Sequence, residues 1–170
     1  MARNPSVRRV EEALRERGLA GRIVELSDST RTAAMAAAAL GCQVEQIVKS
    51  LVFRGTESDL PILVVASGGN RVDEALVAVL VGEAIAKADA VYVRARTGFA
   101  IGGVPPVAHS ERPTILVDEN LLTYRELWAA AGSPFSVFRL TPDELLDLTG
   151  GTLASIAERV RSPQGHQGCE

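Results

Sequence analysis

The sequence contains few of the residues on which disulfide scaffolds and metal sites depend. Its 170 residues include only two cysteines and two histidines. Cys42 and Cys169 lie far apart with no Cys-x-x-Cys spacing, and His109 and His166 have no partner at the spacing of metal ligands. These absences argue against a disulfide-stabilised fold and against a zinc site. We therefore expect neither a metal nor a cofactor.

Long hydrophobic runs are also missing. The longest, Ala33–Leu40 and Leu60–Ala66, are far shorter than the roughly 20 apolar residues that span a bilayer. The first residues lead directly into an amphipathic pattern and lack the apolar core of a signal peptide. We expect a soluble, cytoplasmic protein with no membrane contact.

The common catalytic and nucleotide-binding motifs are absent as well. No Ser/His/Asp or Cys/His set can be assembled, and there is neither a P-loop nor a dinucleotide fingerprint. The net charge of −3 argues against a protein that coats nucleic acid without specificity, but it is compatible with a small basic mouth on an acidic body. An enzyme built from this chain needs few side chains for its chemistry.

Hydrophobic spacing and turn residues predict helices and strands in one domain over residues 1–161, followed by a disordered tail over 162–170. Asn4 and Pro5 start the first helix, and Thr141, Pro142 and Glu144 form a capping box. The segment 89–97 has strand-forming Val and Tyr residues, but its flanking Asp and Gly favour a helix. We expect helices over 5–17, 32–40, 72–81, 89–97, 142–148 and 152–160, and strands over 22–26, 46–54, 60–68, 84–88, 113–118, 125–131 and 135–140.

The loop Thr97–Pro106 has the composition of a binding loop and not of a linker. It holds three glycines and two prolines among apolar residues, whereas disordered linkers are rich in Ser, Gln and charge. Glycine allows positive φ angles and a close approach of a ligand to the backbone. The amides of Gly102, Gly103 and Val104 are therefore candidates to face an oxygen-rich ligand. A tight structural turn at a sheet edge is the alternative.

Lys49 is the second feature that indicates a site. Strand alternation places it on the same face as Ile47, Leu51 and Phe53, so a cation lies among apolar neighbours. Only two of the chain's 18 lysine and arginine residues are lysines, so a lysine here departs from the composition. A compact ammonium group suits a single phosphate or carbonyl oxygen. The alternative is a lysine whose stem covers apolar surface while its head reaches water.

Three more polar residues are candidates, and each has a structural alternative. Thr32 opens an alanine-rich helix, and it either caps that helix or faces a ligand at the positive helix end. Asp118 follows a buried strand, and it either orients a water or a ribose hydroxyl or forms a turn or cap. His109 follows the glycine/proline loop and is either an acid or base or a surface residue.

Taken together, these motifs resemble the YbaK family, which includes the editing domain inserted in bacterial prolyl-tRNA synthetases. The likeness extends from about residue 5 to residue 160 in one order. It is specific because the lysine strand and the Gly-x-x-x-Pro loop both occur, at the expected separation. The matching segments are Thr32 with its alanine-rich helix, Ile47–Phe53, Thr97–Pro106, Ile115–Asp118 and Ala131-Gly132.

The resemblance implies a free-standing aminoacyl-tRNA deacylase, which hydrolyses the ester between a wrong amino acid and the terminal adenosine of a tRNA, most often the tRNA for proline. In the family, the lysine matched by Lys49 contacts the acceptor end. The Gly-x-x-x-Pro loop, matched by Gly102–Pro106, presents backbone amides to the substrate. The implied catalytic residues are Lys49, Gly102 and Gly103, and the expected substrate-binding residues are Thr32, Val104, Pro105, Pro106, His109 and Asp118.

The fold that the resemblance implies is a single α+β domain with a mixed, strongly twisted, barrel-like sheet of about six or seven strands surrounded by helices. The implied partner is the acceptor end of an aminoacyl-tRNA, and a prolyl-tRNA synthetase is a further candidate partner. The oligomeric state is left open.

The loop also departs from the family pattern. Val104-Pro105-Pro106, followed by His109, replaces the Ser-Pro or Thr-Pro form of other members. The amino acid that is removed therefore stays open among alanine, cysteine, 2-aminobutyrate, serine and threonine. The alternative function is a non-catalytic module on the same fold that binds tRNA or protein, which the acidic net charge and the missing general base favour.

Overall fold

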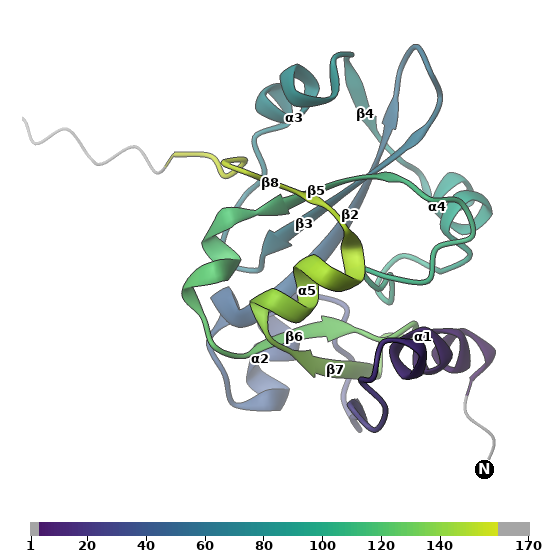
Figure 1. Ribbon diagram of the computed structural model, residues 1–170, viewed down its shortest axis with the longest axis vertical. Coiled ribbons are helices and arrows are strands. Elements are labelled where there is room, and N and C mark those ends of the chain that lie inside the picture. Colours follow the sequence, from purple (N-terminus) through teal and green to yellow (C-terminus); the bar gives the residue numbers. More distant parts are fainter. Residues whose placement is uncertain (1–3, 160–170) are drawn as a thin grey trace, which may run out of the picture.

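A mixed, strongly twisted sheet forms the centre of the computed structural model, which describes residues 4–159 (Figure 1). Its eight strands follow the order β1-β7-β6-β2-β3-β5-β8, and β4 pairs with β2 outside this path. The strands are β1 Ile23–Glu25, β2 Ile47–Gly55, β3 Pro61–Ser67, β4 Ile85–Lys87, β5 Thr114–Asp118, β6 Leu127–Ala130, β7 Ser136–Leu140 and β8 Thr152–Ala154.

Helices flank this sheet, and their ends carry the caps that the sequence predicts. Asn4 caps the first helix through the amide of Ser6, and Thr141 and Glu144 form the reciprocal capping box. Within residues 4–159, none of the helices has both the length and the apolar character needed to cross a membrane. The helices are α1 Pro5–Glu16, α2 Ala33–Leu40, α3 Glu74–Val81, α4 Ala90–Thr97 and α5 Pro142–Thr149, with 3-10 turns η1 Val44–Gln46 and η2 Glu119–Thr123.

The segment with conflicting signals, 89–97, is a helix as predicted. The carboxylate of Asp89 accepts a hydrogen bond from the Tyr92 amide at 2.8 Å, and Gly98 ends the helix with a φ of 83°. The caps therefore decide the conformation against the strand preference of the valine and tyrosine side chains.

The helix predicted over 152–160 is wrong, because Thr152–Ala154 forms β8 and pairs in parallel with β5. Gly151 packs so closely on β5 that a Cβ atom there would lie 2.7 Å from Ile115 Cγ2. This close approach lays the next residues along the free edge of β5, and an edge strand forms where periodicity suggested a helix. All seven predicted strands are confirmed, and β8 is the eighth. The domain boundary at 161 and the tail 162–170 lie outside the described residues.

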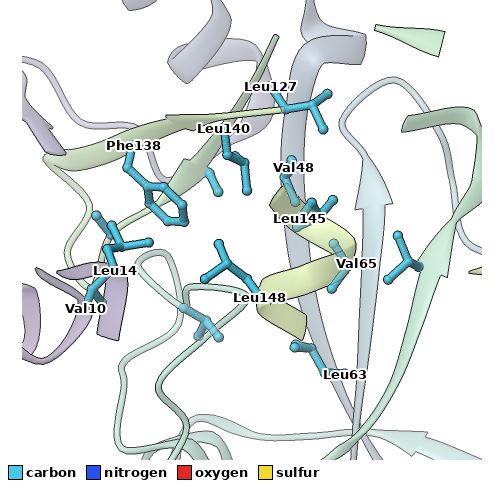
Figure 2. Close-up of a cluster of buried hydrophobic side chains, with 14 of the residues drawn as sticks. Val10, Leu14, Val48, Leu63, Val65, Leu127, Phe138, Leu140, Leu145 and Leu148 are labelled. Atoms are coloured by element: carbon cyan, nitrogen blue, oxygen red, sulfur yellow. The ribbon is translucent and has the colours of Figure 1, made fainter. Parts of the chain in front are cut away.

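The largest group of buried side chains joins α1 and α5 to both halves of the sheet. Val10 and Leu14 from α1 and Leu145 and Leu148 from α5 meet strand residues such as Phe138 (Figure 2). Full burial of one such side chain contributes about 2–3 kcal/mol to stability. This cluster fixes β2 against β6 and β7, and therefore fixes the region described next.

A gap in the sheet lies beside the middle of β2. Along one edge β2 pairs with β3 over its whole length, whereas the other edge pairs with β6 at Ile47–Val48 and with β4 at Phe53–Gly55. Between these two pairings, none of the described strands pairs with residues 49–51 on that edge. β6 and β4 thus diverge from β2 and leave an opening between them.

Candidate active site

A cavity lies at this opening in the sheet. It has a volume of about 700 Å³, which is in the range of small-molecule sites, about 300–1,000 Å³. Residues 47–53 of β2 form one wall, and the ends of β4 and β6 lie beside it. Four residues predicted from the sequence line it together: Thr32, Lys49, Gly102 and Val104.

Lys49 is held in the cavity wall by a main-chain oxygen. Its Nζ donates a hydrogen bond to the carbonyl oxygen of Asn70 at 2.6 Å. An ammonium group has three donors, so two remain for a ligand. Burial lowers the pKa of the Lys49 ammonium group from its ordinary value, and the negative charge of Asp118 opposes this shift.

Asp118 does not line the cavity, and it instead fixes the turn that holds Lys49. Its side chain is almost completely buried, with 1% of its surface exposed. One carboxylate oxygen accepts from the Ser67 amide at 3.1 Å and from Asn70 Nδ2 at 2.8 Å, and the other caps η2 at Asn120 N. Of the two roles considered for Asp118, the structure thus shows the turn and cap.

Thr32 lies at the start of α2, where it caps the helix and also borders the cavity. Its Oγ1 accepts from the Met35 amide at 3.1 Å and caps α2, and the residue also lines the cavity. The preceding Thr30 donates its amide and its hydroxyl to the carbonyl oxygen of Pro134, at 2.5 and 2.7 Å. This tether fixes the start of α2 against the turn between β6 and β7.

Gly102 and Val104 of the glycine/proline loop line the cavity. Gly102 has a φ of 96°, which favours glycine, and a Cβ atom there would lie 3.2 Å from Arg31 Cγ. Within residues 4–159, neither the Gly102 amide nor the Val104 amide has a hydrogen-bond acceptor. These two N–H groups are therefore available to a ligand.

Gly103 differs from its two neighbours. Its amide donates to the carbonyl oxygen of Ala100 at 3.1 Å, and its own carbonyl accepts from the Gly132 amide at 3.0 Å. A Cβ atom at Gly103 would lie 2.8 Å from the backbone of Ser133. The expectation of a free Gly103 amide is wrong, because this residue closes the turn and packs on the β6–β7 connection.

Pro105, Pro106 and His109 lie outside this cavity. Pro106 and His109 line a second cavity of about 250 Å³, and Pro105 is buried. His109 Nε2 lies 2.6 Å from the carbonyl oxygen of Pro105, and because a carbonyl only accepts, Nε2 carries the proton. Burial holds the pKa of His109 below its ordinary value, so the ring is neutral at pH 7. The structure thus gives no support to a substrate contact by these three residues.

Two arginines at the site were not predicted from the sequence. Arg9 of α1 donates to the carbonyl oxygens of Gly98 and Ala108, at 3.2 and 3.1 Å, and so joins the two ends of the loop. Arg31 lies over Gly102 and lines the cavity. The partners of Arg9 lie 89 and 99 residues away in the chain, and no local pattern reveals such contacts.

The acidic residues of the cavity lie on the segments that follow β3 and β8. Glu74 and Glu158 are its lining carboxylates, and Glu158 pairs with Arg71 at 3.7 Å. Within residues 4–159, no group of three or more His, Cys, Asp or Glu side chains could hold a metal ion. The arrangement is a neutral-to-basic cavity with unpaired N–H donors, suited to an oxygen-rich ligand.

Comparison with known proteins connects this cavity to a family. The family model of the aminoacyl-tRNA editing domain matches residues 27–148. The uncharacterized protein YwhH of Bacillus subtilis (strain 168) is 33% identical over 127 residues, which are 75% of this chain and 80% of YwhH.

Two solved structures extend the likeness to almost the whole chain. A candidate trans-editing enzyme for prolyl-tRNA synthetase is 49% identical with a TM-score of 0.86, over 93% of this chain and 100% of that one. A scaffold protein for epitope backbone grafting is 46% identical with a TM-score of 0.85, over the same shares. The matched residues include both walls of the cavity, and the chain belongs to the aminoacyl-tRNA editing domain family, with a YbaK-like fold.

Proposed function

We propose that the protein is a trans-editing deacylase that hydrolyses the ester of a mischarged tRNA. Its substrate is tRNA for proline that carries a small wrong amino acid. The observation that carries the proposal is the shared cavity, which combines the Lys49 ammonium group with the unpaired amides of Gly102 and Val104. The similarity to a candidate trans-editing enzyme for prolyl-tRNA synthetase supports the choice of tRNA.

The chemistry requires stabilisation of charge on one oxygen. Water attacks the ester carbonyl carbon, negative charge develops on the carbonyl oxygen, and the bond to the ribose oxygen then breaks. The Gly102 and Val104 amides donate to the developing oxyanion, and one such donor contributes about 3 kcal/mol in other hydrolases. The neighbouring ribose hydroxyl of the substrate relays the proton: it accepts one from the attacking water and gives its own to the ribose oxygen that leaves. The products are the free amino acid and the uncharged tRNA.

Lys49 binds the acceptor end in this proposal. Its ammonium group is fixed by Asn70 and keeps two free donors, which suit a phosphate or ribose oxygen of the terminal nucleotide. Burial lowers the pKa of the Lys49 ammonium group, and the negative charge of Asp118 opposes this shift and favours the charged form. A cytoplasmic location and recruitment by a prolyl-tRNA synthetase are part of the same proposal.

Selectivity follows from the size of the cavity around the aminoacyl group. One methylene group changes binding by roughly 1–3 kcal/mol in an apolar pocket. The apolar lining from Val52, Val93, Val104 and Ala129 favours small side chains. Alanine, cysteine, 2-aminobutyrate, serine and threonine are the candidates.

The test is a deacylation screen with the full chain. We expect faster release than the spontaneous rate for at least one of alanyl-, cysteinyl-, 2-aminobutyryl-, seryl- and threonyl-tRNA(Pro), and no acceleration for prolyl-tRNA(Pro) as the matched control. Absence of acceleration for all five esters contradicts the proposal. If the protein then still binds the acceptor end, the non-catalytic module is the correct function.

A further inference from the structure

The inference concerns the main chain of Ser50, at the centre of the gap in the sheet. In a strand, the N–H and C=O of one residue point to the same edge, and those of the next residue point to the opposite edge. The Ile47 carbonyl accepts from Gly68 on the β3 side, at 2.7 Å, and the Val52 carbonyl accepts from Ala88 on the β4 side, at 3.4 Å. The N–H and C=O of Ser50 therefore point away from β3, into the gap between β6 and β4.

No strand pairs with these two groups in the part of the chain that the structure describes. The pairing with β6 ends at Val48, the pairing with β4 begins at Phe53, and Ser50 is paired only with Val65 of β3. An unpaired peptide group in the middle of the longest described strand offers one donor and one acceptor, side by side, to a ligand.

The free edge is also accessible from the cavity. Ser50 lines the cavity and is partly exposed, although its hydroxyl oxygen is completely buried and unpartnered. The exposed surface of Ser50 consequently belongs to its main chain and Cβ. Lys49 and Val104 line the same cavity, so a ligand at the Ser50 edge lies within the site already described.

We propose that the aminoacyl group docks on β2 as a single residue of an added strand, an inference that rests on the proposed function. The Ser50 carbonyl accepts from the α-amino group, and the Ser50 amide donates to the ester carbonyl oxygen. An amino acid ester carries N–H and C=O at the spacing of one strand residue, so it completes the pairing of an antiparallel strand. Ser50 is thus a specificity residue that acts through its backbone.

This docking gives a physical reason for the rejection of the correct amino acid. In a prolyl ester, a ring carbon replaces one hydrogen of the α-amino group and restricts the rotation about its N–Cα bond. The secondary amine of a prolyl ester still has N–H hydrogens, so its rejection depends on the ring, which fixes the rotation about the N–Cα bond and occupies one of the directions in which a primary amine donates. Small primary amino acids pair with the Ser50 edge, whereas a prolyl group places its ring against β2.

The first experiment removes the amino group from the substrate. Alanyl-tRNA(Pro) and propionyl-tRNA(Pro), which differ only in this group, are compared with the full chain, each relative to its spontaneous hydrolysis. We expect the acceleration of the alanyl ester to exceed that of the propionyl ester at least 10-fold. Equal acceleration of both overturns the strand-edge docking and leaves the deacylase intact, whereas no acceleration of these two or of any other ester of the screen overturns the proposed function. If another of the five esters is the substrate, that ester and its analogue without the amino group replace the alanyl pair.

The second experiment tests the direction of the Ser50 peptide. Proline lacks an amide hydrogen and is tolerated only where that hydrogen is unpaired in a sheet. We expect Ser50→Pro to fold and to deacylate at least 10-fold more slowly than Ser50→Ala. The matched variant Leu51→Pro loses a hydrogen bond to β3 and is expected to unfold. If Ser50→Pro is as destabilised as Leu51→Pro, the Ser50 edge is not free and the inference fails.

Discussion

Two cavities of this protein share one loop, yet they differ in the state of their polar groups. The loop after α4 contributes Gly102 and Val104 to the cavity of about 700 Å³, and Pro106 and His109 to the cavity of about 250 Å³. In the larger one, amides and the Lys49 ammonium group keep free donors. In the smaller one, His109 Nε2 donates to Pro105 and Arg17 donates to the Asp147 carbonyl oxygen, and the buried atom left without a partner is an acceptor, His109 Nδ1.

The two halves of this loop therefore have different roles: the first half is suited to binding a ligand, and the second half holds the loop in place. The smaller cavity lies below the range of about 300–1,000 Å³ that is common for ligand sites. Its hydrogen bonds, together with Arg9, hold the second half of the loop in place. The first half can then present unpaired amides without collapsing onto its own carbonyl groups. Predictions on residues of each cavity test this division of roles.

The largest effect is expected for Lys49→Met, which keeps the length of the side chain but removes its charge and donors. We expect deacylation to fall about 10- to 100-fold, because a hydrogen bond from a charged group to the acceptor end contributes about 1.5–3 kcal/mol. Stability should change little, because the Asn70 carbonyl oxygen loses one hydrogen bond worth about 1 kcal/mol. Single-turnover rates and thermal unfolding measure the two quantities.

Lys87→Met is the control for this variant. Lys87 is the second lysine of the chain and lines the same cavity. If the role of Lys49 depends on its fixed position, the Lys87 variant loses less than about 10-fold in rate. Equal losses in both variants would mean that only the total positive charge of the cavity matters.

A smaller effect is expected for Gly102→Ala. Its φ of 96° is unfavourable for alanine, and the new methyl group lies 3.2 Å from Arg31 Cγ, so the Arg31 side chain has to shift by a few tenths of an ångström. We expect an activity loss of about 10-fold and a stability loss of about 1–2 kcal/mol. The control is Gly41→Ala, where φ is 66° and no atom lies within 4 Å of the new Cβ. It should lose similar stability at full activity. An unchanged rate in Gly102→Ala would remove the loop amides from the mechanism.

The helices, the strands and most of the β2 wall of the cavity can be predicted from the sequence, because they depend on local signals. Caps, glycine stops and alternation of apolar residues lie within a few positions of each element, and they identify seven strands and five helices. Lys49 and Gly102 stand out for similar reasons, as a cation on an apolar face and a glycine in a stiff loop. The cavity then brings both together, as the family resemblance implies.

The remaining features depend on contacts between distant segments. Asp118 lies at the end of a buried strand, where the sequence suggests a residue that binds a ligand. In the fold, its carboxylate instead accepts hydrogen bonds from the turn 67–70 at the end of the neighbouring strand β3. Gly103 has the same composition around it as Gly102, and only the fold shows that its amide is bonded to Ala100. The gap beside Ser50 exists because β6 and β4 pair with opposite ends of β2, which no single-strand pattern encodes.

The smallest effect on catalysis is expected for His109→Gln, which tests the other side of the comparison. Glutamine can still donate to the Pro105 carbonyl oxygen, and the residue does not line the larger cavity, so we expect deacylation within about twofold of the natural protein. Stability should respond instead. Burial holds the pKa of folded His109 below its ordinary value, so between the folded and unfolded pKa values the unfolded chain binds more protons.

The stability contributed by neutral His109 is therefore fully present above the ordinary histidine pKa of about 6.5, and it is lost as the pH falls through the lower folded value. Urea unfolding at pH 7.5 and pH 5.0 measures this loss. The natural protein should lose more stability between the two pH values than His109→Gln, whose side chain does not titrate. A larger rate loss in this variant than in Gly102→Ala would place His109 in the reaction after all. Equal pH dependence of the two unfolding free energies would mean that the buried ring takes up a proton in the folded protein as readily as in the unfolded chain.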